Sequence, residues 1–124
     1  MTGEISAEML ARYRATAKQR QNEREARLDA RFAAAWDAAH AAVALLKERY
    51  TVDTVWVFGS LLERAKFYER SDIDLAVKQI EGRDYYRAVS ALLDLTPEFS
   101  FDLVEIDYSS PILCDAILRQ GVAL

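Results

Sequence analysis

Two aspartates that stand two residues apart, Asp72 and Asp74, are the strongest candidates for chemistry in this 124-residue chain. They flank Ile73 in an apolar run. Because strand side chains alternate between the two faces of a sheet, both carboxylates point the same way. Two carboxylates at neighbouring positions of one face repel each other unless a cation compensates them. The pair therefore indicates a cation site; the alternative is a pair of surface acids without a ligand.

A third acid, Asp102, interrupts another apolar segment that has the composition of a strand. Its neighbours Phe101 and Leu103 face one side of that strand, so Asp102 faces the other. Mg²⁺ prefers an octahedron of oxygen ligands, which a few carboxylates supply together with phosphate and water. Three aspartates on adjacent strands therefore predict a site for one or two Mg²⁺ ions. Its ligands and catalytic residues are Asp72, Asp74 and Asp102.

The dipeptide Gly59-Ser60 follows the β-branched and aromatic run Thr54–Phe58 and precedes a short helical segment. Glycine lets the backbone come close to a ligand, and free N–H groups at the start of a helix attract anions. The Ser60 hydroxyl can add a hydrogen bond. We therefore expect Gly59 and Ser60 to bind an anionic group. Gly-Ser alone is a weak signal. A strand that leads into Gly-Ser, followed by an Asp-x-Asp strand and then by a strand with a single aspartate, is a much more specific one.

The elements that must position these residues are those of a small α/β domain. Strand patterns and helical patterns alternate after Tyr50. The strands are expected at Thr54–Phe58, Ile73–Val77 and Phe101–Ile106, and the helices at Asp84–Asp94 and from Ser110 to Gly121. This order predicts a mixed sheet of three or four strands with flanking helices, spanning residues 50–124.

Residues 1–49 predict a long N-terminal helical extension. They lack proline and are rich in Ala, Arg, Glu and Gln, which favour helices. An apolar stripe at three- and four-residue steps comprises Leu28, Phe32, Trp36, Ala39, Val43 and Leu46. Between Tyr13 and Arg27 the apolar residues are alanines only, so this stretch should project into solvent or meet a partner. One helix, or two helices broken between Asn22 and Asp29, would both fit.

The net charge of −4 is unevenly distributed along the chain. Residues 1–49 carry +2 and residues 50–124 carry −6, and most of the basic residues lie between Arg12 and Arg31. A basic arm beside an acidic body could contact nucleic acid or an acidic partner. The simpler interpretation is a solvated helix with mixed charges. The helix could also mediate a homo- or hetero-oligomer.

Several classes of protein are disfavoured by the sequence. No apolar run approaches the roughly 20 residues of a membrane span. The stretch Met1–Ile5 lacks the basic and apolar pattern of a secretory signal. Cys114 is the only cysteine, which excludes an internal disulfide and a cysteine-based zinc site. We therefore expect a cytoplasmic protein without membrane contact.

The segment VWVFGSLLERAKFYERSDIDLAV, followed by SFDLVEID, resembles the minimal nucleotidyltransferases of the DNA polymerase beta superfamily. The resemblance covers roughly residues 50–124, and the ending Ala116–Val122 is also similar to that of these proteins. It implies Mg²⁺-dependent transfer of a nucleoside monophosphate from an NTP, with ATP as the expected donor, to a hydroxyl. Many of these proteins are the antitoxin of a HEPN-type toxin, and some adenylylate a tyrosine of that toxin. The resemblance therefore implies a HEPN-type toxin as partner.

The roles that the resemblance implies can be assigned to individual residues. Gly59 and Ser60 would hold the triphosphate. Asp72 and Asp74 would bind two metal ions. Asp102 would complete the site and orient or deprotonate the acceptor hydroxyl.

Two departures from the family's pattern lie in one connecting loop. Eleven residues separate Ser60 from Asp72, one more than is commonest, and Arg64 stands where a second glycine is usual. Both departures are expected to affect the shape of the loop and the choice of substrate more than they affect the metal site.

Two other functions remain as alternatives. One is a catalytically silent antitoxin that neutralises its toxin by binding it. The other is a drug-modifying nucleotidyltransferase, which is disfavoured because the sheet is not followed by a second domain that could enclose a drug. Nucleic acid is disfavoured as an acceptor, since a body with a charge of −6 repels phosphates.

The remaining conspicuous side chains are interpreted as structural. Four aromatic residues are expected in the core rather than as a base-stacking platform: Trp36, Trp56, Tyr85 and Tyr86. His40 has no second histidine and no nearby cysteine, so it is not expected to bind metal. Glu105 is expected to be exposed, with assistance to the site as the alternative.

Overall fold

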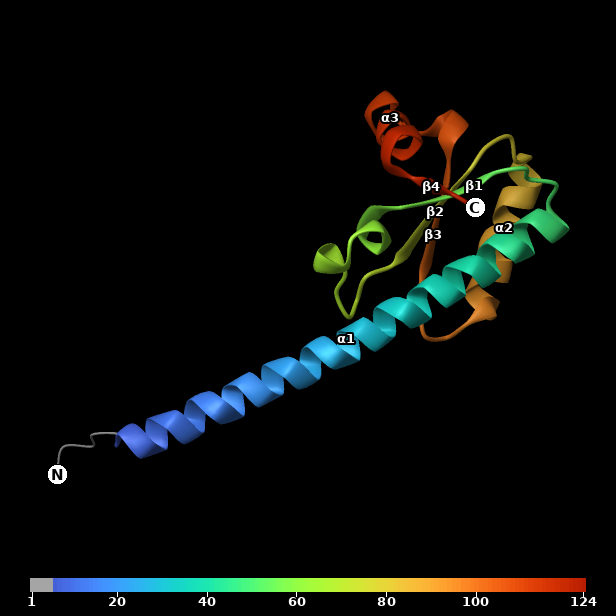
Figure 1. Cartoon of the computed structure of the whole chain (residues 1–124). Helices are drawn as coiled ribbons and strands as arrows, with labels where there is room; N and C mark the ends of the chain where they lie inside the picture. Colours follow the sequence, from blue (N-terminus) through green and yellow to red (C-terminus); the bar gives the residue numbers. More distant parts are fainter. Residues whose placement is uncertain (1–5) are drawn as a thin grey trace.

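A long helix leads into a four-stranded sheet with helices on both faces (Figure 1). The computed structural model describes residues 6–124, so the Met1–Ile5 stretch considered for a leader lies outside the described residues. The helices and strands are α1 (Ala7–Arg49), β1 (Val55–Phe58), β2 (Ile73–Val77), α2 (Gly82–Leu95), β3 (Phe101–Glu105), α3 (Pro111–Gln120) and β4 (Val122–Ala123). Short 3₁₀ turns are η1 (Gly59–Leu62), η2 (Arg64–Lys66) and η3 (Ile106–Tyr108).

Helix α1 is continuous over its 43 residues, which confirms the single-helix alternative. At its start the Ser6 side chain accepts a hydrogen bond from the Met9 amide at 3.1 Å. At its end Tyr50 caps the helix by donating to the Leu46 carbonyl, and Thr51 turns the chain with a φ of 49°. At 1.5 Å per residue the helix is about 65 Å long.

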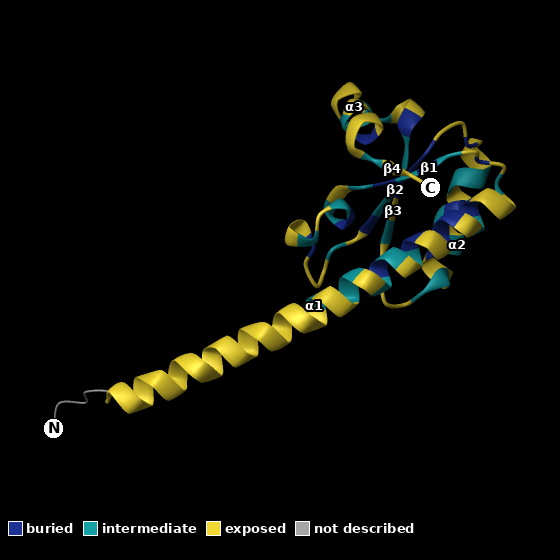
Figure 2. Ribbon diagram, in the orientation of Figure 1, coloured by how far each residue is buried: buried dark blue, intermediate teal, exposed yellow. Residues whose placement is uncertain are grey.

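The two halves of α1 differ in environment (Figure 2). Every residue of Ser6–Arg27 is exposed, as expected from the lack of large apolar residues after Tyr13. From Leu28 onward the predicted stripe packs on the core. Its closest contacts are made by alanines, since Ala35, Ala39 and Ala42 have no exposed surface. Small side chains therefore bring this half of α1 close to the sheet.

Arg31 fixes α1 to two distant segments at the start of its packed half. Its Nε donates to the Glu69 carbonyl and its Nη2 to the Glu98 carbonyl, both at 2.9 Å. The guanidinium also lies 4.4 Å from the centroid of the Phe99 ring, within the range of a cation–π contact. These contacts join the helix to the loop before β2 and to the loop before β3.

The sheet has the order β3-β2-β1-β4 and is mixed, which confirms the predicted α/β fold. β1 is antiparallel to β2 and to β4, whereas β2 and β3 are parallel. Parallel neighbours need a crossover connection, and α2 provides it. The two-residue strand β4 was not among the three strands assigned from the sequence.

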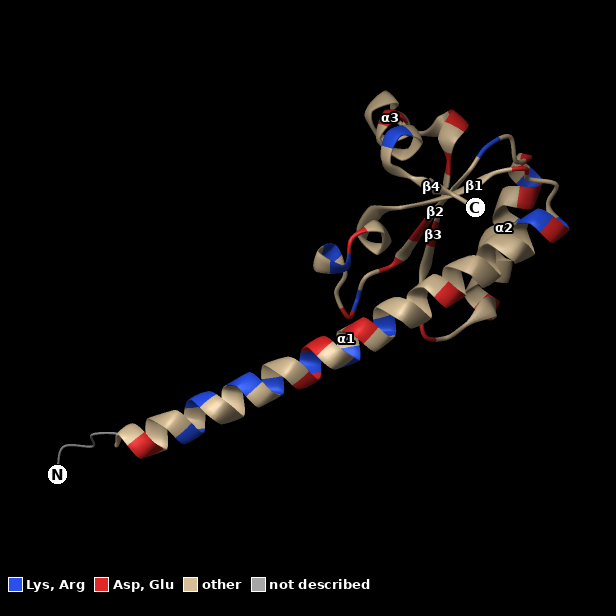
Figure 3. Ribbon diagram, viewed as in Figure 1, with Lys and Arg blue, Asp and Glu red and all other residues tan. Residues whose placement is uncertain are grey.

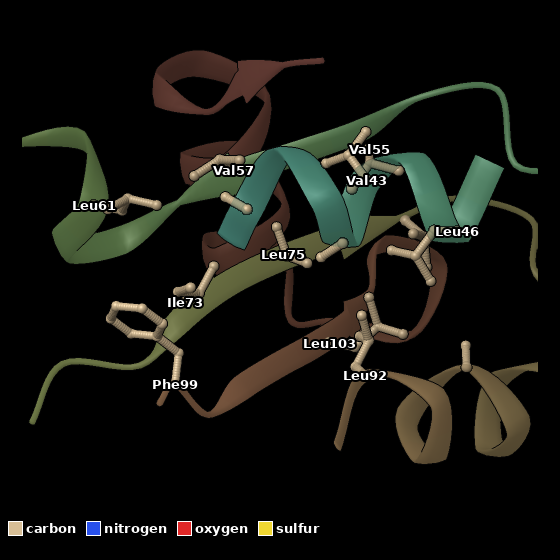
Figure 4. Close-up of a cluster of buried hydrophobic side chains, with 14 of the residues drawn as sticks. Val43, Leu46, Val55, Val57, Leu61, Ile73, Leu75, Leu92, Phe99 and Leu103 are labelled. Atoms are coloured by element: carbon tan, nitrogen blue, oxygen red, sulfur yellow. The ribbon is translucent and has the colours of Figure 1, made fainter. Parts of the chain in front are cut away.

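The two faces of the sheet bury different residues. The packed half of α1 and helix α2 cover one face, where Val57, Leu75 and Leu103 lie (Figure 4). Helix α3 covers part of the other face, where Ile117 packs with Ala76. Because side chains alternate along β2, Asp74 lies on the same face as Ala76, which is the face that α3 partly covers. Replacing the fully buried Leu75 by alanine would cost roughly 2–5 kcal/mol of stability.

The expectation that four aromatic residues lie in the core is correct for three of them. Trp36, Trp56 and Tyr85 are partly buried and pack on the core clusters. Tyr86 is 74% exposed, because on α2 it falls beside the buried face rather than on it. The division of the chain at residues 49 and 50 stays a prediction. Among the described residues, no helix combines the length and apolar character needed to cross a membrane.

Candidate active site

The site is centred on Asp74, which lies between β1 and β3. In the strand register Asp74 is opposite Phe58 of β1 on one side and opposite Asp102 of β3 on the other. Asp74 and Asp102 are therefore side by side on adjacent strands, on the same face of the sheet. The sequence predicted that these aspartates lie on adjacent strands. Gly59 follows directly after Phe58, so the end of β1 comes next to the Asp74 carboxylate.

Gly59 has the backbone conformation that only glycine adopts easily, with a φ of +76°. A β-carbon at this position would overlap the Oδ2 atom of Asp74. Glycine is thus required here for two reasons, the positive φ and the space that the carboxylate occupies. The sequence predicted a close approach of the backbone to a ligand; the structure shows a close approach to Asp74.

The Asp74 carboxyl holds its proton more tightly than an ordinary aspartate does. Burial, together with the negative charges of Asp102 and Asp72, raises its pKa from 3.8 to about 6. Burial makes the largest contribution, followed by Asp102 and then Asp72. A cation at this place would reduce the repulsion and favour the charged form of Asp74.

Asp72 reaches the site from the segment before β2 rather than from the strand itself. The preceding turn is fixed by Ser71, whose hydroxyl oxygen accepts a hydrogen bond from the Tyr68 amide at 2.8 Å. After Asp72, the Ile73 amide donates to the Ser100 carbonyl at 2.9 Å and so starts the pairing with β3. Asp72 is exposed, as is Asp102, whereas Asp74 is partly buried between them.

The fit of these residues to Mg²⁺ follows from the donor set. Within residues 6–124, no three His, Cys, Asp or Glu side chains stand close enough together to hold a metal ion by themselves. Mg²⁺ in phosphate-transfer sites usually takes one or two carboxylates and completes its shell with substrate phosphates and water. Asp74 and Asp102, which are neighbours in the strand register, fit that kind of site. A set of three aspartate ligands stays a prediction.

A cleft of about 540 Å³ opens beside Gly59 and Ser60. Gln120 lines it because β4 pairs with β1: extension of the Val57–Val122 register places Gln120 opposite Gly59. Lys66 of η2 also lines the cleft and is its one basic residue within the described chain. Its amino group lies 3.3 Å from the Glu63 carboxylate in an exposed ion pair, which binds weakly and leaves the lysine free to move.

On the other side of Asp102, a groove of about 540 Å³ follows the edge of β3. Tyr85 and Tyr86 of α2 line it, together with Tyr108 of η3. The Tyr85 hydroxyl donates to the Leu103 carbonyl at 2.9 Å. Burial, and then the charge of Glu105 and that of Asp102, raises the pKa of Tyr85. The negative charges of Glu105 and Asp102 therefore influence the side chains of this groove.

The family model described as "Polymerase beta, Nucleotidyltransferase" matches residues 41–124, which is more than half of the chain. The chain belongs to this nucleotidyltransferase family. The match includes β1, Asp72, Asp74 and Asp102 and extends to the last residue. No curated protein matches the chain.

Solved structures support the nucleotidyltransferase fold. A mutant of the toxin-antitoxin MntA-HpeT has a TM-score of 0.56 and 20% identity, over 68% of this chain and 69% of that chain. A toxin-antitoxin structure with AMP-PNP has a TM-score of 0.55 and 24% identity, over 65% and 67%. The toxin-antitoxin MntA-HepT has a TM-score of 0.52 and 21% identity, over 69% and 68%.

Arg64, the departure from the nucleotidyltransferase pattern, joins the loop after Gly59-Ser60 to α1. Its Nε lies 2.6 Å from the Asp29 carboxylate and its Nη2 lies 3.1 Å from that of Glu25. The guanidinium is therefore engaged on the helix, and Arg64 does not line the cleft beside Gly59 and Ser60. In this chain these ion pairs connect the long N-terminal helix directly to the loop after Gly59-Ser60.

Sequence reasoning missed Lys66, Gln120 and the groove along β3. Lys66 is one of several charged residues between Ser60 and Asp72, and nothing in its spacing singles it out. Gln120 reaches the cleft through the pairing of β4 with β1, a long-range contact that local periodicity does not reveal. The groove needs the relative placement of α2 and η3, which is also set by tertiary packing.

Proposed function

We propose that this chain is a Mg²⁺-dependent nucleotidyltransferase that transfers AMP from ATP to a tyrosine hydroxyl of a HEPN-type toxin. The observation that carries the proposal is the placement of Asp74 between Gly59 and Asp102, at the level where the phosphate cleft begins. The family membership supports nucleotidyl transfer. The toxin-antitoxin structures of the same fold, one of them with AMP-PNP, support ATP and a toxin as the two substrates.

The residues divide into those that hold the nucleotide and those that hold the metal. The Gly59 and Ser60 backbone, the Ser60 hydroxyl and the Lys66 amino group would bind the triphosphate. Asp72 and Asp74 would hold Mg²⁺ together with the phosphate oxygens, and Asp102 would complete the shell. When bound, the metal neutralises negative charge at the attacking and leaving oxygens.

Asp102 has a second role in the transfer itself. The tyrosine oxygen attacks the α-phosphorus of ATP and forms a new P–O bond. The bond from that phosphorus to the oxygen bridging to the β-phosphate breaks, and pyrophosphate leaves. The hydroxyl proton passes to the Asp102 carboxylate, which is exposed and lines the groove along β3. Such transfer depends mostly on positioning and charge neutralisation, so a small site suffices.

A protein acceptor is favoured by the charge of the catalytic part. Residues 50–124 carry a net charge of −6, which repels the phosphates of nucleic acid. The exposed half of α1 provides an interaction surface of its own. Four basic residues and no acidic one lie between Met9 and Asn22 (Figure 3).

A second candidate is an antitoxin that neutralises its toxin by binding alone. The engagement of Arg64 with Glu25 and Asp29 favours it, because a loop tied to α1 is less free to close over a nucleotide. The long exposed stretch Ser6–Arg27 also favours a binding role.

Release of pyrophosphate separates the two candidates. The chain is incubated with its toxin and Mg-ATP, and pyrophosphate is measured with a coupled enzyme assay. Nucleotidyl transfer predicts release that depends on the toxin and is lost with Asp102→Asn. Neutralisation of the toxin without pyrophosphate release would establish the binding antitoxin instead.

A further inference from the structure

The groove along β3 is separate from the phosphate cleft, and the two lie on opposite sides of Asp74. The cleft begins at Gly59, beyond the end of β1, whereas the groove begins at Asp102 on the edge strand β3. No residue lines both. In an in-line transfer the attacking and leaving oxygens lie on opposite sides of the phosphorus. If the triphosphate occupies the cleft, the acceptor must approach from the side of the groove.

We propose that this groove binds the acceptor segment of the partner protein, and that it selects a tyrosine flanked by arginine or lysine. The inference rests on the proposed function for the direction of transfer. The shape and charge of the groove are independent of it.

The charge of the groove selects a basic occupant. Asp102 and Glu105 line it, and its lining within the described residues includes no lysine or arginine. Tyr86 and Tyr108 are 74% and 84% exposed, and their rings present aromatic surface to an incoming side chain. Cations bind both carboxylates and aromatic faces, and arginine does so with particular frequency.

The same walls accept a tyrosine ring. Tyr85 and Tyr86 already form an edge-to-face pair, with centroids 5.4 Å apart, and an incoming ring can extend this arrangement. The groove volume of about 540 Å³ lies within the range of pockets that enclose small ligands. A tyrosine held there would direct its hydroxyl toward Asp102, at the end of the groove nearest Asp74.

Recognition by side chains is favoured over the addition of a strand to β3. An edge strand can pair with a peptide through its free backbone groups. Here the Leu103 carbonyl already accepts a hydrogen bond from the Tyr85 hydroxyl at 2.9 Å. This bond covers the middle of the edge, so the occupant is held by its side chains.

Peptide binding without nucleotide tests the groove separately from catalysis. Two fluorescent peptides, each with one tyrosine, carry either arginines or glutamates at the flanking positions. Anisotropy is measured with the full chain, its Glu105→Gln variant and its Tyr86→Ala/Tyr108→Ala variant. Tyr13→Ala is the matched control, since Tyr13 on α1 is 74% exposed, as Tyr86 is.

The arginine peptide should bind more tightly than the glutamate peptide, and each groove variant should weaken its binding by about fivefold or more. Tyr13→Ala should bind as the unaltered chain does. Equal affinity for the two peptides, no binding of the arginine peptide, or full binding by both groove variants would overturn the proposal. Toxin adenylylation is measured separately. Transfer of AMP that persists in both groove variants would overturn the role of the groove but leave the proposed nucleotidyl transfer intact. Peptide binding without any transfer supports the groove and contradicts the proposed function.

Discussion

The carboxylate of Asp74 lies against the α-carbon of Gly59, in the space that a β-carbon on residue 59 would fill. This contact joins the end of β1 to the beginning of β2. It also means that the backbone segment assigned to phosphate and the carboxylate assigned to metal cannot be changed independently.

Gly59→Ala should therefore displace Asp74 and strain the backbone, since alanine is unfavourable at a φ of +76°. We expect a loss of roughly 1–3 kcal/mol in the free energy of unfolding, and loss of Mg-ATP binding. Denaturant unfolding and calorimetry measure the two effects. Gly82→Ala is the control, because a β-carbon there meets no atom within 4 Å. Unchanged nucleotide binding by Gly59→Ala would contradict the assignment of Gly59.

Asp74→Asn should stabilise the metal-free protein at neutral pH. Because folding raises the pKa of Asp74 from 3.8 to about 6, the folded state binds its proton more tightly than the unfolded state does. The free energy of unfolding therefore falls as the pH rises through this window and stays lower above it. Solvent screening at this partly exposed site limits the effect to about 1 kcal/mol.

Thermal unfolding in EDTA measures this difference. The variant should melt above the unaltered chain near pH 7.5, and the two should converge below about pH 3, where Asp74 is protonated in both the folded and the unfolded state. A large drop in the melting temperature of the variant at both pH values would show that Asp74 has a structural role.

Lys66→Ala should weaken Mg-ATP binding by about tenfold, since a charge-assisted contact to phosphate is worth roughly 1.5–3 kcal/mol. The fold should be unaffected, because Lys66 is exposed and its ion pair with Glu63 is weak. Lys78→Ala is the matched control: Lys78 is also exposed but does not line the cleft. Equal affinity of the Lys66 variant and the unaltered chain would remove Lys66 from the nucleotide site.

A chain shortened to begin at Leu28 should keep its fold. Every residue of Ser6–Arg27 is exposed, and removing the stretch breaks the Glu25–Arg64 ion pair but keeps the 2.6 Å pair of Arg64 with Asp29. The loss in the free energy of unfolding should be within about 1 kcal/mol. Circular dichroism and thermal melts test this. Aggregation of the shortened chain would mean that the stretch contributes to the core.

The fold was largely predictable because its signals are local. The run Ile73–Val77 identified β2, and the alternation of its side chains identified the face on which Asp74 lies. The cap at Ser110 with Pro111 in the first turn identified α3. The apolar stripe of α1 identified its packed half. β4 was not predicted because two residues are too few for a period-two pattern. Tyr86 was wrongly placed in the core because neighbouring positions on a helix point in different directions.

The candidate site was predictable only where it depends on strand alternation. That rule placed Asp74 and Asp102 on one face, and the register confirms that they are opposite each other. The roles of Arg64 and Lys66 depend on where a loop folds, and sequence spacing does not determine this. The groove beside Tyr85 and Tyr86 likewise needs the packing of α2 along β3.

The intact mass of the toxin after incubation with this chain and Mg-ATP tests the central claim most directly. We expect the toxin to gain the mass of one or more AMP units, because Gly59-Ser60 would seat the triphosphate and Asp102 would receive the hydroxyl proton. Asp72→Asn and Asp102→Asn should each abolish the gain. A toxin of unchanged mass that is nevertheless neutralised would contradict nucleotidyl transfer and leave binding as the function of this chain.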